Sequence, residues 1–180
     1  MPSPIGHGLA SLILGGRPGR RRADVARAVL LVAIGVAPDL DLLWGRHGME
    51  THSVGMALIV AFVLAYALRV RTVLGVRTNL GAFVLVTAVW FAHPLLDALG
   101  EDSSPPYGVM MWWPFSQRHV IASFAVFDSI YRAYWKSDFW SHNAVAAAKE
   151  IAILAPIAAV VWFWRRRRDR AGTGSPGIPH

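Results

Sequence analysis

Apolar residues occur along the chain in long runs that polar side chains interrupt at only a few places. Three runs contain no charged residue, 53–68, 78–92 and 151–164. Each is a little shorter than the ~20 apolar residues that cross the hydrocarbon core of a bilayer, so each needs residues from its flanks to do so. Two shorter apolar runs cover 25–37, which Arg27 interrupts, and 5–14, which reaches only part of the way.

These runs predict helices, because they are rich in alanine and leucine and show no alternation with a period of two residues. A helix also satisfies its own backbone hydrogen bonds, as a spanning segment must. We therefore expect an all-α fold, an integral membrane bundle of about four transmembrane helices. A short N-terminal helix over 5–14 and an interfacial amphipathic segment over 127–140 would complete it. Residues 1–164 would form one membrane-embedded domain, and 165–180 a basic, disordered C-terminal tail.

The composition supports a membrane protein. Of the 180 residues, 54% are hydrophobic and only 16% are charged, whereas roughly 25% are charged in a typical soluble domain. The chain contains no cysteine. Disulfides and thiolate metal ligands are therefore excluded.

The positive charge follows the apolar runs. The net charge is +7, and twelve of the eighteen Lys and Arg residues lie in three clusters that flank these runs, at 17–22, 69–77 and 165–170. If the four longer runs each cross the membrane, all three clusters face one side, as the positive-inside rule requires. We therefore expect a multi-pass protein of the bacterial inner membrane with its C-terminal tail in the cytoplasm. Membrane lipids, and no nucleic acid, are the expected partners.

Histidines and aspartates collect at the opposite ends of the runs, which this topology turns outward. Ionisable residues near membrane depth usually mark a functional site. A single histidine at a span end is more often an ordinary hydrogen-bonded residue, but here several converge from three spans. The candidate metal ligands are Asp39, Asp41, His47, His52, His93 and Asp97. His119 and Asp128 are weaker candidates, and His142 is expected at the surface.

The spacing within two motifs decides which side chains can share a site. His93 and Asp97 in HPLLDAL are four residues apart and share one face if a helix continues through Pro94. Asp39 and Asp41 in PDLD face the same side only in an extended segment. Otherwise Asp39 is the better ligand, and Asp41 is a partner that orients a ligand or caps a helix.

The motif HGMETH places His47 and His52 five residues apart, which suits a loop around an ion better than one face of a helix. Glu50, between them, is the loop carboxylate best placed by sequence for a catalytic role. Thr51 or Ser53 would cap the next helix.

The donor set predicts the kind of metal. Imidazoles and carboxylates without sulfur suit zinc best, with manganese or iron as alternatives. Six ligands exceed one tetrahedral site, so we expect one or two divalent ions. Two ions would activate water for in-line attack on a phosphoester.

Five segments in this order resemble the bacterial inner-membrane metal-dependent hydrolase family often called YdjM-like: MPSPIGHGLA, PDLDLL, HGMETHSVG, HPLLDAL and MMWWPFS. The resemblance covers roughly residues 1–127. It implies that His7 joins the metal ligands named above, and that residues 113–116 are a family feature. The family commonly has Arg and then Gly after the first histidine of its third motif, whereas here Arg46 precedes His47.

The order of these residues is also distantly similar to the zinc-dependent phospholipase C pattern, a helical fold with a multi-zinc phosphodiester site. The resemblances imply a membrane-bound metal-dependent hydrolase in residues 1–164, acting on a phosphoester or lipid-like substrate through a metal-activated water. Two alternatives stay open. One is a metal or proton transporter, which is disfavoured because a conduction path needs polar groups at several depths and the middles of the spans offer only Thr87, glycine and aromatic residues. The other is a non-catalytic membrane protein with a structural metal site.

The position of His7 limits the geometry of such a site. A helix over 5–14 is ~15 Å long, about half of a bilayer core. If His7 is a ligand, the site is sunk into the membrane, the first segment is re-entrant, or the orientation is reversed.

Overall fold

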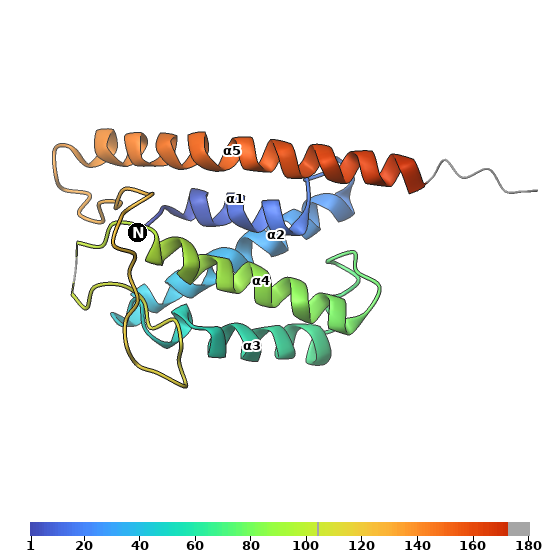
Figure 1. The fold of residues 1–180 in the computed structure, drawn as a ribbon, viewed down its shortest axis with the longest axis horizontal. Helices are drawn as coiled ribbons and strands as arrows, with labels where there is room; N and C mark the ends of the chain where they lie inside the picture. Colours follow the sequence, from blue (N-terminus) through green and yellow to red (C-terminus); the bar gives the residue numbers. More distant parts are fainter. Residues whose placement is uncertain (104, 173–180) are drawn as a thin grey trace, which may run out of the picture.

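The structure is a computed structural model that describes residues 1–103 and 105–172. These residues are helical or irregular and form no β-strand, so the expected all-α fold is confirmed (Figure 1). In chain order the helical elements are α1 (Pro4–Gly15), α2 (Arg22–Val36), η1 (Ala37–Trp44), η2 (Glu50–His52), α3 (Val54–Phe62), η3 (Val63–Ala67), α4 (Asn79–Ala98) and α5 (Phe139–Gly172).

Helix α1 is the centre of the bundle. It contacts α2, α4 and α5, while α3 packs on the far side of α4. Among the described helices, α5 packs only on α1. A helix of only 12 residues therefore connects the α2–α3–α4 group to the long C-terminal helix.

Helix α1 lies close to its neighbours because small residues face them. A Cβ atom added at Gly15 would lie 2.2 Å from the Leu31 side chain, and one at Gly35 of α2 would lie 1.8 Å from Ser11 Oγ. Small residues at helix contacts let backbones approach closely, which is how helices associate in lipid. Any larger residue at Gly35 would push α1 and α2 apart.

The core lies between α2, α3 and α4. Its fully buried members include Leu31, Ile34, Ala57, Ala61, Val86 and Val89. Large apolar side chains also cover the outside of the helices, among them Val29, Phe62, Leu80, Val84 and Val160. An apolar exterior on this scale is typical of a surface that contacts lipid.

Two helices are long and apolar enough to cross a membrane, α4 and the part of α5 over Phe139–Arg168. Helix α1 and the Val54–Ala67 segment are apolar but shorter. The expectation of about four transmembrane helices therefore exceeds what helix length alone supports. It stays a prediction.

Two expectations about the C-terminal third need correction. Helix α5 continues through Gly172, so the segment 165–172 is helical and not part of a disordered tail, because arginine is a good helix former. Residues 173–180 of the expected tail lie outside the described residues. The segment 127–138 is irregular with short turns, and helix begins only at Phe139.

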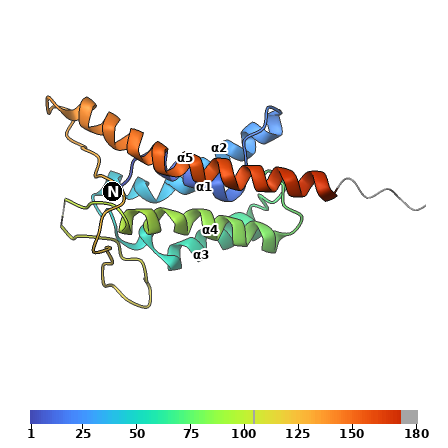
Figure 2. The same cartoon turned by 45° about the horizontal axis from the view of Figure 1, so that its top comes forward.

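The three arginine clusters share one end of the bundle, as the sequence predicted. The α1–α2 turn, the connection from η3 to α4, and the C-terminal end of α5 lie at the end opposite the N-terminus and the long connection 99–138 (Figures 1 and 2). Arg27 and Arg165 donate hydrogen bonds to the carbonyl oxygens of Gly15 and Leu14 at 2.5 and 2.9 Å. These arginines thereby satisfy the last carbonyls of α1.

Candidate metal centre

Helix α4 supplies two side chains to the opposite end of the bundle. It continues through Pro94, so His93 and Asp97 share one face and are both buried. His93 Nε2 lies 3.2 Å from Asp97 Oδ2. The other ring nitrogen, Nδ1, donates a hydrogen bond to the carbonyl oxygen of Gly35 at 2.7 Å. That bond orients the ring so that His93 Nε2 faces the carboxylate.

His7 joins this pair from the first turn of α1. Its ring is buried and stacks on the His93 ring with 3.6 Å between the ring centroids. His7 Nε2 lies 3.4 Å from Asp97 Oδ1. Helix α1 begins at this end of the bundle and ends beside the arginines, so His7 reaches the cluster from the first turn of α1, and the depth of the cluster in a membrane stays a prediction.

The element η1 places its two aspartates differently. It is a 3-10 helix rather than an extended segment, and its two aspartates approach His52 from different sides, Asp39 at Nε2 and Asp41 at Nδ1. Asp39 Oδ1 lies 3.4 Å from His93 Nε2 and 3.8 Å from His52 Nε2. Asp39 therefore faces the α4 residues, as its role as the better ligand requires.

Asp41 lies behind the histidines of the loop. Its two carboxylate oxygens accept from His47 Nδ1 at 2.9 Å and from His52 Nδ1 at 3.0 Å. The Thr51 hydroxyl donates a third hydrogen bond to it at 2.6 Å. Held in this way, His52 directs Nε2 toward Asp97 Oδ2, 3.3 Å away. A carboxylate that orients a histidine through its second nitrogen is typical of metal sites.

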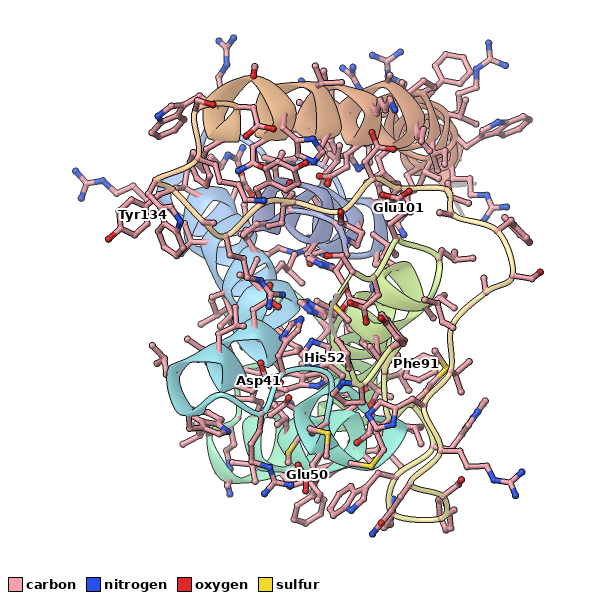
Figure 3. The ribbon with its side chains drawn as sticks, turned by 90° about the vertical axis from the view of Figure 1, so that its left-hand side faces the viewer. Asp41, Glu50, His52, Phe91, Glu101 and Tyr134 are labelled. Carbon is pink, nitrogen blue, oxygen red and sulfur yellow. The ribbon has the colours of Figure 1, made fainter. Side chains whose placement is uncertain are left out.

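The donors form two adjacent groups whose ligand atoms lie within 4.8 Å of one another in each group. One is His7, His93 and Asp97, and the other is Asp39, His47 and His52. His52 Nε2 and His93 Nε2, 3.2 Å apart, join the two groups. Figure 3, which looks onto this end of the molecule, shows Asp41 and His52 side by side among the converging elements.

Several polar atoms of the cluster have no hydrogen-bond partner among the described residues. They are both ring nitrogens of His7 and both carboxylate oxygens of Asp97, and all four atoms are buried. Buried polar atoms without partners are costly and rare in proteins. A divalent cation would provide a partner for those His7 and Asp97 atoms that face the cluster. The residues therefore fit the metal that the donor set predicts.

The charges of the loop residues indicate a site for a cation. Burial by itself would raise the pKa of Asp39, but hydrogen bonds from His52 and His93 outweigh it and hold that pKa well below its usual range. Burial would likewise raise the pKa of Asp41, and hydrogen bonds from His47 and His52 lower it. Burial would lower the pKa of His52, yet its carboxylate partners raise it well above the usual value. The negative potential that favours a proton on His52 also favours a metal ion.

Glu50, the candidate catalytic residue, lies apart from the cluster. Its carboxylate accepts from Arg46 at 2.6 Å near the surface, and Figure 3 places it at the margin of this end of the molecule. The arginine that precedes His47 is thus engaged with Glu50. His142 begins α5 and bonds the Ser129 carbonyl at 2.8 Å, away from the cluster.

Two contacts of the site were not predicted from the sequence. Thr51 or Ser53 was expected to cap the next helix, and Ser53 does so, while Thr51 donates to Asp41. The carbonyl of Gly35 that orients His93 has no sequence signal, because a backbone oxygen is present at every position.

The segment 113–116, expected only as a family feature, holds the start of α3. Two backbone amides at the N-terminus of α3, of Val54 and Gly55, donate to the carbonyls of Met111 and Trp113 at 2.9 and 3.0 Å. A Cβ atom at Gly55 would lie 2.5 Å from the Trp113 carbonyl oxygen. This contact fixes the helix that begins directly after His52.

The described residues thus form an all-helical protein with two helices able to cross a membrane and a buried cluster of histidines and aspartates. The chain belongs to the YdjM inner membrane protein family, whose model matches residues 3–169. The match extends beyond the segment 1–127 that carried the resemblance in the sequence. No curated protein and no solved structure shows a detectable match to the chain.

Proposed function

We propose that the protein is a membrane-bound metal-dependent hydrolase that acts on a phosphoester or a similar bond in a lipid-like substrate. The observation that carries this proposal is the set of buried His7 and Asp97 atoms that lack a hydrogen-bond partner among the described residues and face other imidazole and carboxylate groups. Such a set without sulfur suits zinc, with manganese or iron as alternatives. When bound, one or two such ions supply a Lewis acid and an activated water.

The residues of the chain divide between holding the ion and orienting its ligands. His7, His93 and Asp97 form one ligand group, and Asp39 and His52 extend it. His47 lies at the edge of this ligand group. Asp41 and the Gly35 carbonyl act through His52 and His93, whose Nδ1 atoms they bind.

Access to the cluster favours catalysis over a purely structural metal site. His7, His52, His93 and Asp97 are buried. In contrast, the side chains of Asp39 and His47 are 21% and 14% exposed. Water and substrate can therefore approach from that side. A transporter is disfavoured, because the core beneath the cluster is lined by alanine, valine and leucine.

The proposed topology has four crossings, made by α2, the Val54–Ala67 segment, α4 and α5, with α1 entering only part of the way. The arginine end faces the cytoplasm under this proposal. The metal centre then faces outward.

The test measures metal content and turnover together. Purified protein should retain at least one transition-metal ion per chain by mass spectrometry. His93→Gln and Asp97→Asn should each lower this content by about tenfold or more, since each removes a ligand from one shared group. Hydrolysis of a phosphodiester probe should fall in proportion to metal content.

The matched controls are His142→Gln and Asp128→Asn, which change the same residue types away from the cluster. Both should retain the metal. Metal content that does not respond to His93→Gln or Asp97→Asn would refute the centre. Metal retained without turnover on a broad panel of phosphoesters and lipids would leave a structural metal site instead.

A further inference from the structure

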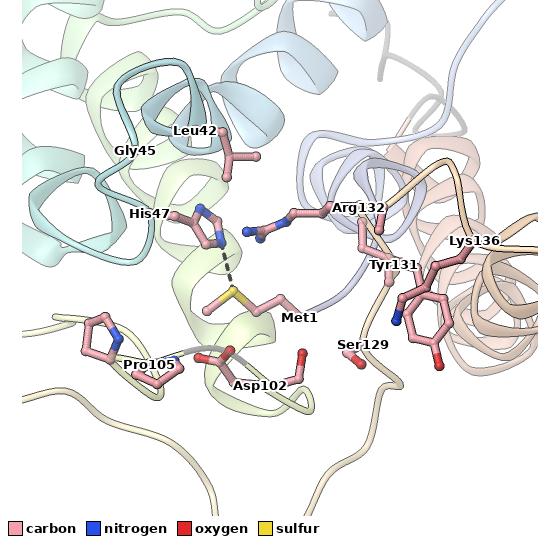
Figure 4. A pocket seen from close by; sticks show the side chains of 14 residues that line it. Met1, Leu42, Gly45, His47, Asp102, Pro105, Ser129, Tyr131, Arg132 and Lys136 are labelled. Carbon is pink, nitrogen blue, oxygen red and sulfur yellow. Dashed lines mark hydrogen bonds between the residues drawn. The ribbon is translucent and has the colours of Figure 1, made fainter. Parts of the chain in front are cut away.

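A pocket of about 670 Å³ adjoins the metal centre at His47. Four parts of the chain line it: the N-terminal Met1, η1 with the following loop, the connection after α4, and the segment 129–136 before α5 (Figure 4). Its size is that of a small-molecule site. His47 belongs both to this wall and to the cluster, because its Nδ1 bonds Asp41 while its Nε2 lies 2.8 Å from Met1 Sδ on the pocket side.

The pocket contains two cations from one short segment. Arg132 and Lys136 both line it, and Figure 4 shows the Arg132 guanidinium extending toward His47. Lys136 Nζ lies 4.6 Å from the centre of the Tyr131 ring. The carboxylate in the lining, Asp102, accepts a hydrogen bond from the Gly108 amide at 2.8 Å. The lining thus carries more positive than negative charge, which favours an anionic ligand.

Exposed apolar side chains lie next to residues that line the pocket. Leu42 lines the pocket and is exposed, and its neighbours Leu43 and Trp44 in η1 are exposed as well. On the other side, Tyr134 and Trp135 are exposed within the same segment that carries the two cations. Aromatic and aliphatic side chains of this kind are typical of the level of lipid headgroups. A ligand with a charged head and an apolar chain matches both regions.

We infer that this pocket binds the phosphate-bearing headgroup of a membrane lipid, with Arg132 and Lys136 paired to the phosphate oxygens and the acyl chains along the exposed apolar side chains next to the lining. Arginine recognises phosphate through two parallel hydrogen bonds, and lysine adds a point charge. This inference rests on the proposed function, because it assigns the substrate class of the same centre. The headgroup would then lie beside His47, at the entrance of the cluster.

The test measures binding rather than turnover. The probe is the non-hydrolysable phosphonate analogue of dioctanoyl phosphatidic acid, titrated into purified full-length protein in detergent. The double variant Arg132→Gln/Lys136→Gln should weaken binding by at least about tenfold, because two charge-assisted contacts are lost. The variant Arg132→Lys should bind the analogue with an affinity between that of the unsubstituted protein and that of the double variant. The matched control Arg118→Gln, an exposed arginine of the same end outside the pocket lining, should bind as the unsubstituted protein does.

Two further ligands separate a lipid from a soluble phosphoester. Propylphosphonate should bind more weakly than the lipid analogue, and dioctanoylglycerol, which has no phosphate, should not compete. Equal affinity for propylphosphonate and the lipid analogue would assign the pocket to a soluble phosphate compound and overturn the inference. Unchanged binding in the double variant, with its melting temperature and metal content preserved, would also overturn it.

Failure of the proposed function would look different. If Asp97→Asn loses metal and turnover but keeps lipid binding that depends on Arg132, the headgroup site stands without the metal chemistry. If the double variant loses binding but keeps hydrolysis of a water-soluble diester, both proposals are supported. If neither metal nor turnover is found in the unsubstituted protein, the hydrolase proposal fails. The headgroup site then stands or falls on whether Arg132→Gln/Lys136→Gln weakens binding of the lipid analogue.

Discussion

The two ends of helix α1 lie in different chemical surroundings. Its C-terminal end lies among arginines, and its N-terminal end lies among histidines and aspartates. At one end Arg27 and Arg165 bind the last carbonyls of α1; Arg165 is exposed, whereas Arg27 is half-buried. At the other end the imidazoles and carboxylates face one another, and buried atoms of His7 and Asp97 lack hydrogen-bond partners among the described residues. The arginines bind backbone oxygens of α1. The residues of the His/Asp cluster could hold a metal ion, so the arginine end carries a signal of topology and the other end carries a candidate chemical site.

The largest effect on this comparison should come from removing the metal. Treatment with a chelator should lower the melting temperature by about 10 °C, since a tightly bound ion stabilises only the folded state. Differential scanning fluorimetry with and without added zinc measures this shift. Asp97→Asn should abolish it. A chelator effect of the same size in that variant would mean that the stabilising ion binds elsewhere.

A smaller effect should follow from changing one aspartate at each end. Asp41→Asn should weaken metal affinity by about 10–100-fold, because the amide no longer orients both histidines as a carboxylate does. Asp24→Asn is its counterpart at the arginine end, where Asp24 accepts from the Arg21 amide at 3.2 Å. It should leave metal affinity unchanged, as measured by competition with a zinc indicator. Equal losses in both variants would point to general destabilisation instead of an orienting role.

The smallest perturbation tests which end faces outward. The chain has no cysteine, so single cysteines report without background. Ser123→Cys in the connection at the metal end should react with an impermeant thiol reagent in intact cells, whereas Thr72→Cys at the arginine end should react only after permeabilisation. Both positions are exposed. The reverse pattern would place the metal centre in the cytoplasm and overturn the proposed topology.

Parts of the site followed from local sequence and parts did not. His93 and Asp97 were predicted together because four residues in a helix return to the same face, and α4 confirms that they share one. The role of Asp41 was left between two alternatives, because the local geometry of PDLD decides it, and η1 resolved it toward His47 and His52. Glu50 was favoured by position alone, without regard to Arg46, which pairs with it.

By itself, the sequence determined the helical class, the sorting of arginines to one end, and the residue types that could bind a metal. These follow from composition and from periodicity, which act over a few turns of chain. Only the tertiary structure decided that His7 reaches His93 across α1 and α4, that a backbone carbonyl orients His93, and that 129–136 closes a pocket beside His47. Such contacts join residues far apart in the chain, and close packing at small residues such as Gly35 determines them.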